Sequence, residues 1–157
     1  MLNGLQRLMA RIAGIPALSD AAALAARLLV AGLFVPEGWG KLTDYADNVS
    51  YMTQFGVDPR LLPLVIALEL GGGLALAAGL AARPLAFALG VFCLLAALLF
   101  HRGEDFSEVL EFRKDFAIGG GLFALTALGA GGWSLDALIA RWLRRAPAPG
   151  PADAVRR

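Results

Sequence analysis

A single carboxylate, Glu69, lies inside the long apolar stretch from Leu61 to Ala82. As a helix this stretch would be about 33 Å long, enough to cross the ~30 Å hydrocarbon core of a bilayer. An ionisable group at that depth costs roughly 2.5–3.5 kcal/mol, so it needs a partner or a functional role. Because buried carboxylates often carry protons in membrane proteins, Glu69 is a candidate catalytic residue.

Arg27 is the cation that we predict as the partner of Glu69. Counting helix rise inward from the ends of the two apolar segments puts the axial distance between these residues under ~10 Å. An ion pair across the two helices would spare each charge from burial alone. The same pair could be purely structural, and Arg27 could instead extend its side chain to the membrane surface.

Five more ionisable residues are predicted to meet at the outer end of the helices. They are Glu37, Lys41, His101, Lys114 and Asp115. Glu37 and Lys41 are spaced i, i+4, which favours an ion pair on one helix face. Groups of these types can hold a carbonyl compound and transfer its protons. The alternative is that they are interfacial ion pairs and helix-end anchors without chemistry.

The composition indicates a membrane protein and excludes several classes of function. Of the 157 residues, 58% are hydrophobic and 17% are charged, more apolar than a typical soluble domain. A net charge of +1 without a basic stripe argues against nucleic-acid binding. One cysteine and one histidine exclude a thiol pair and a Cys/His metal site. We see no metal, haem or flavin motif.

We therefore expect an all-α fold, a polytopic membrane four-helix bundle with up-down-up-down topology over residues 19–132. The predicted spans are residues 21–40, 61–82, 85–101 and 115–131. Arg83 and Pro84 are predicted to form the whole turn between the second and third spans. The polar connection that follows Lys41 holds several aromatic residues, so it is expected to fold back over the mouth of the bundle as a short helix.

Two interfacial amphipathic helices are predicted to flank the bundle, one within residues 1–18 and one at 133–145. The Pro- and Ala-rich tail at 146–157 is predicted to be disordered. With both termini inside, lysine and arginine are distributed eight to five in favour of the inner side. This bias predicts that both termini are cytoplasmic.

The sequence resembles the DoxX family of small four-helix membrane proteins. The resemblance is carried by residues 27–42, 55–84, 98–101, 114–125 and 129–136. Many relatives have Lys-Asn where this chain has Lys114 followed by Asp115. The resemblance implies a bacterial inner-membrane bundle linked to membrane redox, including subunits like those of thiosulfate:quinone oxidoreductase, and to oxidative-stress complexes.

Our leading hypothesis is an inner-membrane subunit of a redox system that binds a quinone and receives electrons from a protein partner. The predicted catalytic groups are Glu69, Glu37 and His101. The predicted cofactor-binding groups are Arg27, Lys41, Lys114 and Asp115. The alternatives are a non-catalytic membrane scaffold or assembly protein and, third, a small-molecule or proton carrier. A homo-oligomer is compatible with each of them.

Overall fold

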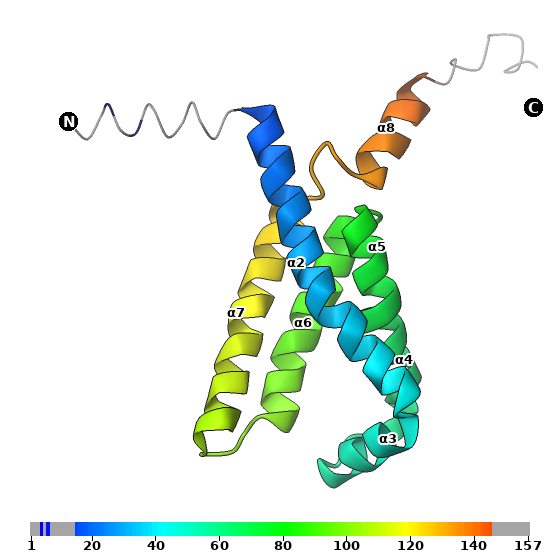
Figure 1. Ribbon diagram of the computed structural model, residues 1–157, viewed down its shortest axis with the longest axis vertical. Helices are drawn as coiled ribbons and strands as arrows, with labels where there is room; N and C mark the ends of the chain where they lie inside the picture. The colour runs from blue at the N-terminus through cyan, green and yellow to red at the C-terminus, as the bar shows by residue number, and fades with distance from the viewer. Residues whose placement is uncertain (1–3, 5, 7–14, 146–157) are drawn as a thin grey trace, which may run out of the picture.

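The structure is a computed structural model that describes residue 4, residue 6 and residues 15–145. Those residues are helical and contain no strand, which confirms the all-α fold (Figure 1). The elements are α2 (Pro16–Thr43), α3 (Tyr45–Gln54), η1 (Pro59–Leu61), α4 (Leu62–Ile66), η2 (Ala67–Gly72), α5 (Gly73–Ala78), α6 (Ala82–Phe100), α7 (Phe106–Leu128) and α8 (Leu135–Arg145). The elements η1, α4, η2 and α5 follow one another without a break and act as one long helix.

Within the part of the chain that the structure describes, three helices are long and apolar enough to cross a membrane. They are Pro16–Thr43, Pro59–Ala78 and Ala82–Phe100. The fourth predicted span, residues 115–131, overlaps α7, which begins at Phe106 instead of near residue 115 and ends at Leu128. Helix α7 carries charged residues along its first half. Helix α7 packs along α6, and Figure 1 shows the two side by side. Its passage through the membrane stays a prediction.

The predicted turn at Arg83 and Pro84 is wrong. The chain turns earlier, at Gly79 with φ +71° and Ala81 with φ +48°, and α6 already begins at Ala82. Glycine readily takes this left-handed conformation and so ends the preceding helix. Proline is tolerated in the first turn of a helix because its missing N–H has no partner there in any case.

The core lies where α2, α5, α6 and α7 meet, and small residues let α6 and α7 approach closely. Ala86, Gly90, Cys93 and Ala97 are all buried along one side of α6. A Cβ at Gly90 would come within 3.0 Å of the Phe123 ring of α7, so a side chain at this position would require the ring to shift. Cys93 is part of the core, as expected for a lone buried thiol.

Arg27 does not pair with Glu69, so that prediction is wrong. Its side chain is fully buried and donates hydrogen bonds to the carbonyl oxygens of Ala77, at 2.7 Å, and Trp133, at 2.6 Å. Helix α2 begins well beyond the end of α5 (Figure 1), so Arg27 is level with the last turn of α5 and not with its middle. There it satisfies a carbonyl that the end of a helix leaves without a partner.

Other charged residues close the same end of the bundle, which we call the Arg27 end. Arg83 donates to the carbonyl oxygen of Ala127 at 2.8 Å, near the end of α7. The carboxylate of Asp136 accepts hydrogen bonds from the backbone N–H groups of Ala81, at 2.8 Å, and Ala82, at 3.0 Å. The ionisable groups of this end thus satisfy helix termini and tie α8 to the bundle.

Helix α8 lies within the segment predicted as a second interfacial helix, and its place at a membrane interface stays a prediction. The predicted N-terminal interfacial segment at 1–18 lies almost wholly outside the described residues, and the tail at 146–157 lies outside them altogether. The predicted cytoplasmic orientation of the termini likewise stays a prediction.

We expect Arg27→Gln to lower the free energy of unfolding by at least ~2 kcal/mol, because it leaves buried carbonyl groups without a donor. The measurement is SDS-induced unfolding of the protein in mixed micelles, followed by circular dichroism. Arg113→Gln, at an exposed position of α7, is the matched control and should change stability by less than ~0.5 kcal/mol. Equal stability of the two variants would contradict a capping role for Arg27.

Candidate functional site

A cavity of about 710 Å³ lies between α2, α3, the η2 region, α6 and α7, at the end of the bundle opposite Arg27. We call this the cavity end. Leucine, valine, phenylalanine and methionine side chains form most of its walls. Its polar lining comprises Glu37, Lys41, Asn48, Tyr51, Glu69, His101, Glu111, Lys114 and Asp115. The structure thus brings to one cavity every predicted site residue except Arg27, which it places at the other end.

Lys41 is the partner of the buried Glu69 carboxylate. Its Nζ lies 2.9 Å from Oε2 and 3.1 Å from Oε1 of Glu69, whose residue surface is only 3% exposed. The same Nζ lies 3.3 Å from the exposed carboxylate of Glu37, so the predicted i, i+4 pair is confirmed. One lysine therefore joins an exposed carboxylate to a buried one. A proton donor and two acceptors meet at this point of the cavity wall.

The backbone that carries Glu69 is irregular. Ala67–Gly72 forms a turn of π-helix between two α-helical segments. Such turns are rare and occur frequently at functional sites. Helix α2 packs directly against this turn, because a Cβ on Gly38 would lie 2.5 Å from the backbone nitrogen of Leu70 and 3.0 Å from Cβ of Glu69. Glycine at position 38 thus permits the approach that brings Lys41, one turn further along α2, to Glu69.

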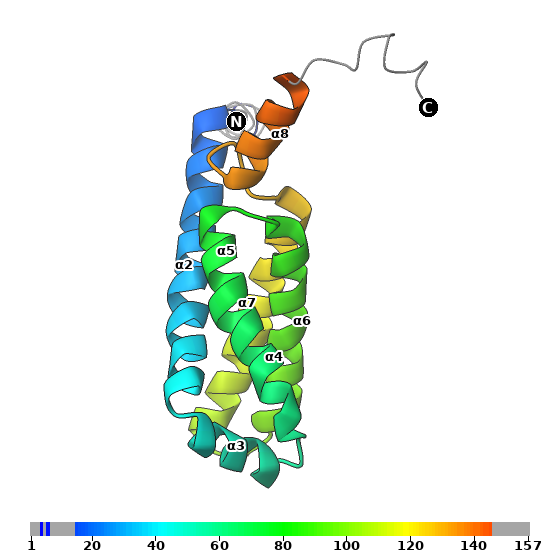
Figure 2. The same cartoon turned by 90° about the vertical axis from the view of Figure 1, so that its right-hand side faces the viewer.

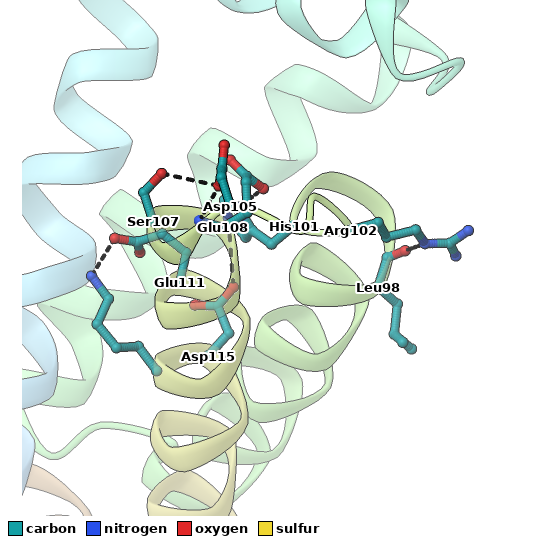
Figure 3. Close-up of polar contacts among 9 residues, drawn as sticks. Leu98, His101, Arg102, Asp105, Ser107, Glu108, Glu111 and Asp115 are labelled. Atoms are coloured by element: carbon teal, nitrogen blue, oxygen red, sulfur yellow. Dashed lines mark hydrogen bonds and ion pairs between the residues drawn. The ribbon is translucent and has the colours of Figure 1, made fainter.

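A second polar cluster lies where α6 ends and α7 begins (Figure 3). Nδ1 of His101 lies 3.2 Å from a carboxylate oxygen of Glu108, and Nε2 lies 3.9 Å from one of Asp115. Lys114 pairs with Glu111 at 2.6 Å. The imidazole therefore stands between a carboxylate that lines the cavity, Asp115, and one that does not, Glu108. This arrangement can hold a proton on either ring nitrogen.

Glu108 and Glu111 were not among the predicted site residues. They precede Asp115 by seven and four residues, so the three carboxylates fall on one face of α7. This spacing was a usable signal. The spacing of these carboxylates was hard to distinguish in the sequence, because charged residues also occupy the other faces of the same helix.

Helix α3 covers the cavity end, as the aromatic content of the connection predicted, and Figure 2 shows it lying across the end of the bundle. Its Tyr51 ring stacks on Phe100 of α6, with ring centroids 5.4 Å apart and an interplanar angle of 22°. The pKa of the Tyr51 phenol is raised, mainly because the side chain is partly buried and to a smaller extent because the Glu108 carboxylate is near. The hydroxyl therefore stays protonated at neutral pH and can donate a hydrogen bond into the cavity.

Residues 15–145 contain no cluster of three or more histidine, cysteine, aspartate or glutamate side chains placed to hold a metal ion. The donors that face the cavity are instead ammonium, imidazole and phenol groups, on Lys41, Lys114, His101 and Tyr51. Each of these groups can donate a hydrogen bond to an oxygen acceptor of a ligand. Arg27 takes no part, since its hydrogen bonds go to backbone carbonyls at the other end of the bundle.

Comparison with known proteins gives a family and two relatives. The profile of the DoxX family matches residues 22–102. Inner membrane protein YqjF of Escherichia coli (strain K12) is 44% identical over 125 residues, covering 78% of this chain and 95% of the relative. Inner membrane protein YphA of the same organism is 28% identical over 121 residues, covering 72% and 86%. No solved structure matches.

We expect Gly38→Ala to destabilise the protein by about 1–3 kcal/mol, because its methyl group overlaps the backbone of the π-helical turn. Gly40→Ala is the matched control two residues along the same helix, where an added Cβ meets nothing within 4 Å. Thermal unfolding in detergent compares the two variants. A Gly38→Ala protein as stable as Gly40→Ala would contradict the close approach of α2 to the turn.

Proposed function

The chain belongs to the DoxX family of inner-membrane proteins, and from this premise we propose that its cavity binds a quinone within a membrane redox system. The observation that carries the proposal is the cavity itself. Two hydrogen-bonding clusters, one from α2 and η2 and one from α6 and α7, line the cavity. Its other walls are apolar apart from Asn48 and Tyr51 of α3. A quinone has the matching form, an apolar ring with two carbonyl acceptors.

The size of the cavity supports this assignment. About 710 Å³ falls inside the usual 300–1,000 Å³ of small-molecule sites, which are mostly apolar with a few placed polar groups. The walls also reach the outside of the bundle. Leu33, Leu95 and Leu99 line the cavity and are each at least 40% exposed. An apolar ligand could therefore enter from the lipid without crossing water.

The chain's own residues would bind the ligand and manage its protons. Lys41, Lys114, His101 and Tyr51 can donate hydrogen bonds to carbonyl oxygens, and the pairing of Lys41 with Glu69 fixes the position of one donor. Glu69, Glu37 and Asp115 are the acceptors through which a proton could enter or leave the cavity. A bound quinone supplies reversible electron and proton transfer. We propose that a protein partner supplies the electrons.

We expect Lys41→Gln and Lys114→Gln each to weaken the binding of a short-chain ubiquinone analogue by at least about tenfold, because each removes a charged donor worth about 1.5–3 kcal/mol. Isothermal titration calorimetry on detergent-purified protein measures the dissociation constant. Arg113→Gln is the matched control, because Arg113 precedes Lys114 on α7 and does not line the cavity.

Extraction of the purified wild-type protein provides an independent test, with mass spectrometry used to identify co-purifying quinones. We expect wild-type protein to retain quinone and Glu69→Gln to retain less. A wild-type protein without extractable quinone, together with unchanged redox activity of membranes carrying Glu69→Gln, would overturn the proposal. Retention of a stable protein partner by a variant that lacks every charge of the cavity would then favour a scaffold.

A further inference from the structure

We propose that α8 binds the anionic phospholipid surface of the membrane, with its apolar face in the headgroup region and its arginines on lipid phosphates. This inference concerns the Arg27 end and is independent of what the cavity binds. It rests on three features of α8, which are its attachment to the bundle, its uncovered apolar face and its unpaired positive charges.

The start of α8 is fixed at the level where two apolar helices end. The backbone N–H of Asp136 donates to the carbonyl oxygen of Gly79 at 2.9 Å, directly after α5. The Asp136 carboxylate accepts from the N–H groups of Ala81 and Ala82, where α6 begins. Since the apolar stretches Pro59–Ala78 and Ala82–Phe100 end here, these bonds hold α8 at the boundary of the hydrocarbon region.

The apolar side chains of α8 lie on one face and are uncovered. They follow i, i+3, i+4, i+7, i+8 spacing and are Leu135, Leu138, Ile139, Trp142 and Leu143. Trp142 is 70% exposed and Leu143 is 59% exposed. A contiguous apolar face of this kind needs a cover. Figures 1 and 2 show α8 beyond the end of α5, clear of the rest of the bundle.

The opposite side of α8 is basic. Arg141, Arg144 and Arg145 are largely exposed, and no carboxylate within residues 15–145 forms an ion pair with any of them. Arg141 also donates a hydrogen bond to the carbonyl oxygen of Gly132 at 3.4 Å. The only carboxylate of α8, on Asp136, is already occupied by the N–H groups at the start of α6. Guanidinium groups bind phosphate with paired hydrogen bonds. An anionic lipid surface therefore complements this side of the helix.

Lipid is favoured over a protein partner because α8 carries both an apolar face, which suits the acyl chains, and arginines, which suit the lipid phosphates. An amphipathic helix with tryptophan on one face and arginines on the other is the typical form of an interfacial helix. Tryptophan in particular collects at the headgroup level. Leu80 and Leu128 are also exposed at this end of the bundle.

The test follows the fluorescence of Trp142. The chain has three tryptophans, so Trp39→Phe with Trp133→Phe leaves Trp142 alone. This variant is reconstituted into two kinds of vesicle, one of phosphatidylcholine and one of an equal mixture of phosphatidylcholine and phosphatidylglycerol. In both, the acyl chains carry bromine near the headgroup, where it quenches the fluorescence of a nearby tryptophan. We expect quenching in both vesicles and stronger quenching with phosphatidylglycerol. Absence of quenching in both would overturn the proposal.

The role of the arginines is tested on the same background by Arg141→Gln, Arg144→Gln and Arg145→Gln together. Native mass spectrometry measures the preference for retained phosphatidylglycerol over phosphatidylcholine, which we expect to fall about tenfold. The matched control removes equal charge at the other end of the molecule, by Arg60→Gln, Arg102→Gln and Arg113→Gln. An equal fall in both triple variants, or in neither, would overturn the recognition of anionic lipid by α8.

Discussion

The ion pair between Lys41 and Glu69 is the interaction on which the cavity end depends. A carboxylate that is 3% exposed inside an apolar helix is tolerated only beside a cation, and the 2.9 Å contact provides one. To make this contact, α2 must lie against the backbone of the π-helical turn, which Gly38 permits. The pair thus determines how closely two helices approach, and it leaves a polar wall facing the cavity.

The two ends of the bundle use charge in different ways. At the Arg27 end, Arg27, Arg83 and Asp136 donate to or accept from backbone groups that helix termini leave free. The contacts of these side chains are hydrogen bonds to the backbone. At the cavity end, ionisable side chains such as His101 contact one another and line a hollow. The candidate site is therefore the cavity end, where these side chains surround a space.

The membrane helices and one of the ion pairs could be predicted from the sequence, whereas the partner of Glu69 could not. The length of the apolar segments predicted membrane helices, and the i, i+4 spacing of Glu37 and Lys41 predicted their pair. The partner of Glu69 was predicted wrongly, because depth counting assumes that the helices begin at the same level. Helix α2 instead extends past the end of α5, and that offset has no signature in either segment alone.

By itself the sequence determined the all-α membrane fold and the residue types that reach the cavity end, because apolar length and helical spacing are local properties. The family followed from the resemblance of the sequence segments to known proteins. The tertiary structure decided which charges pair. In the folded protein Lys41, not Arg27, lies beside Glu69. The π-helical turn Ala67–Gly72 lies where α2 packs closely against this segment. Such pairings depend on how far one helix slides along another, and packing across the whole interface sets that register.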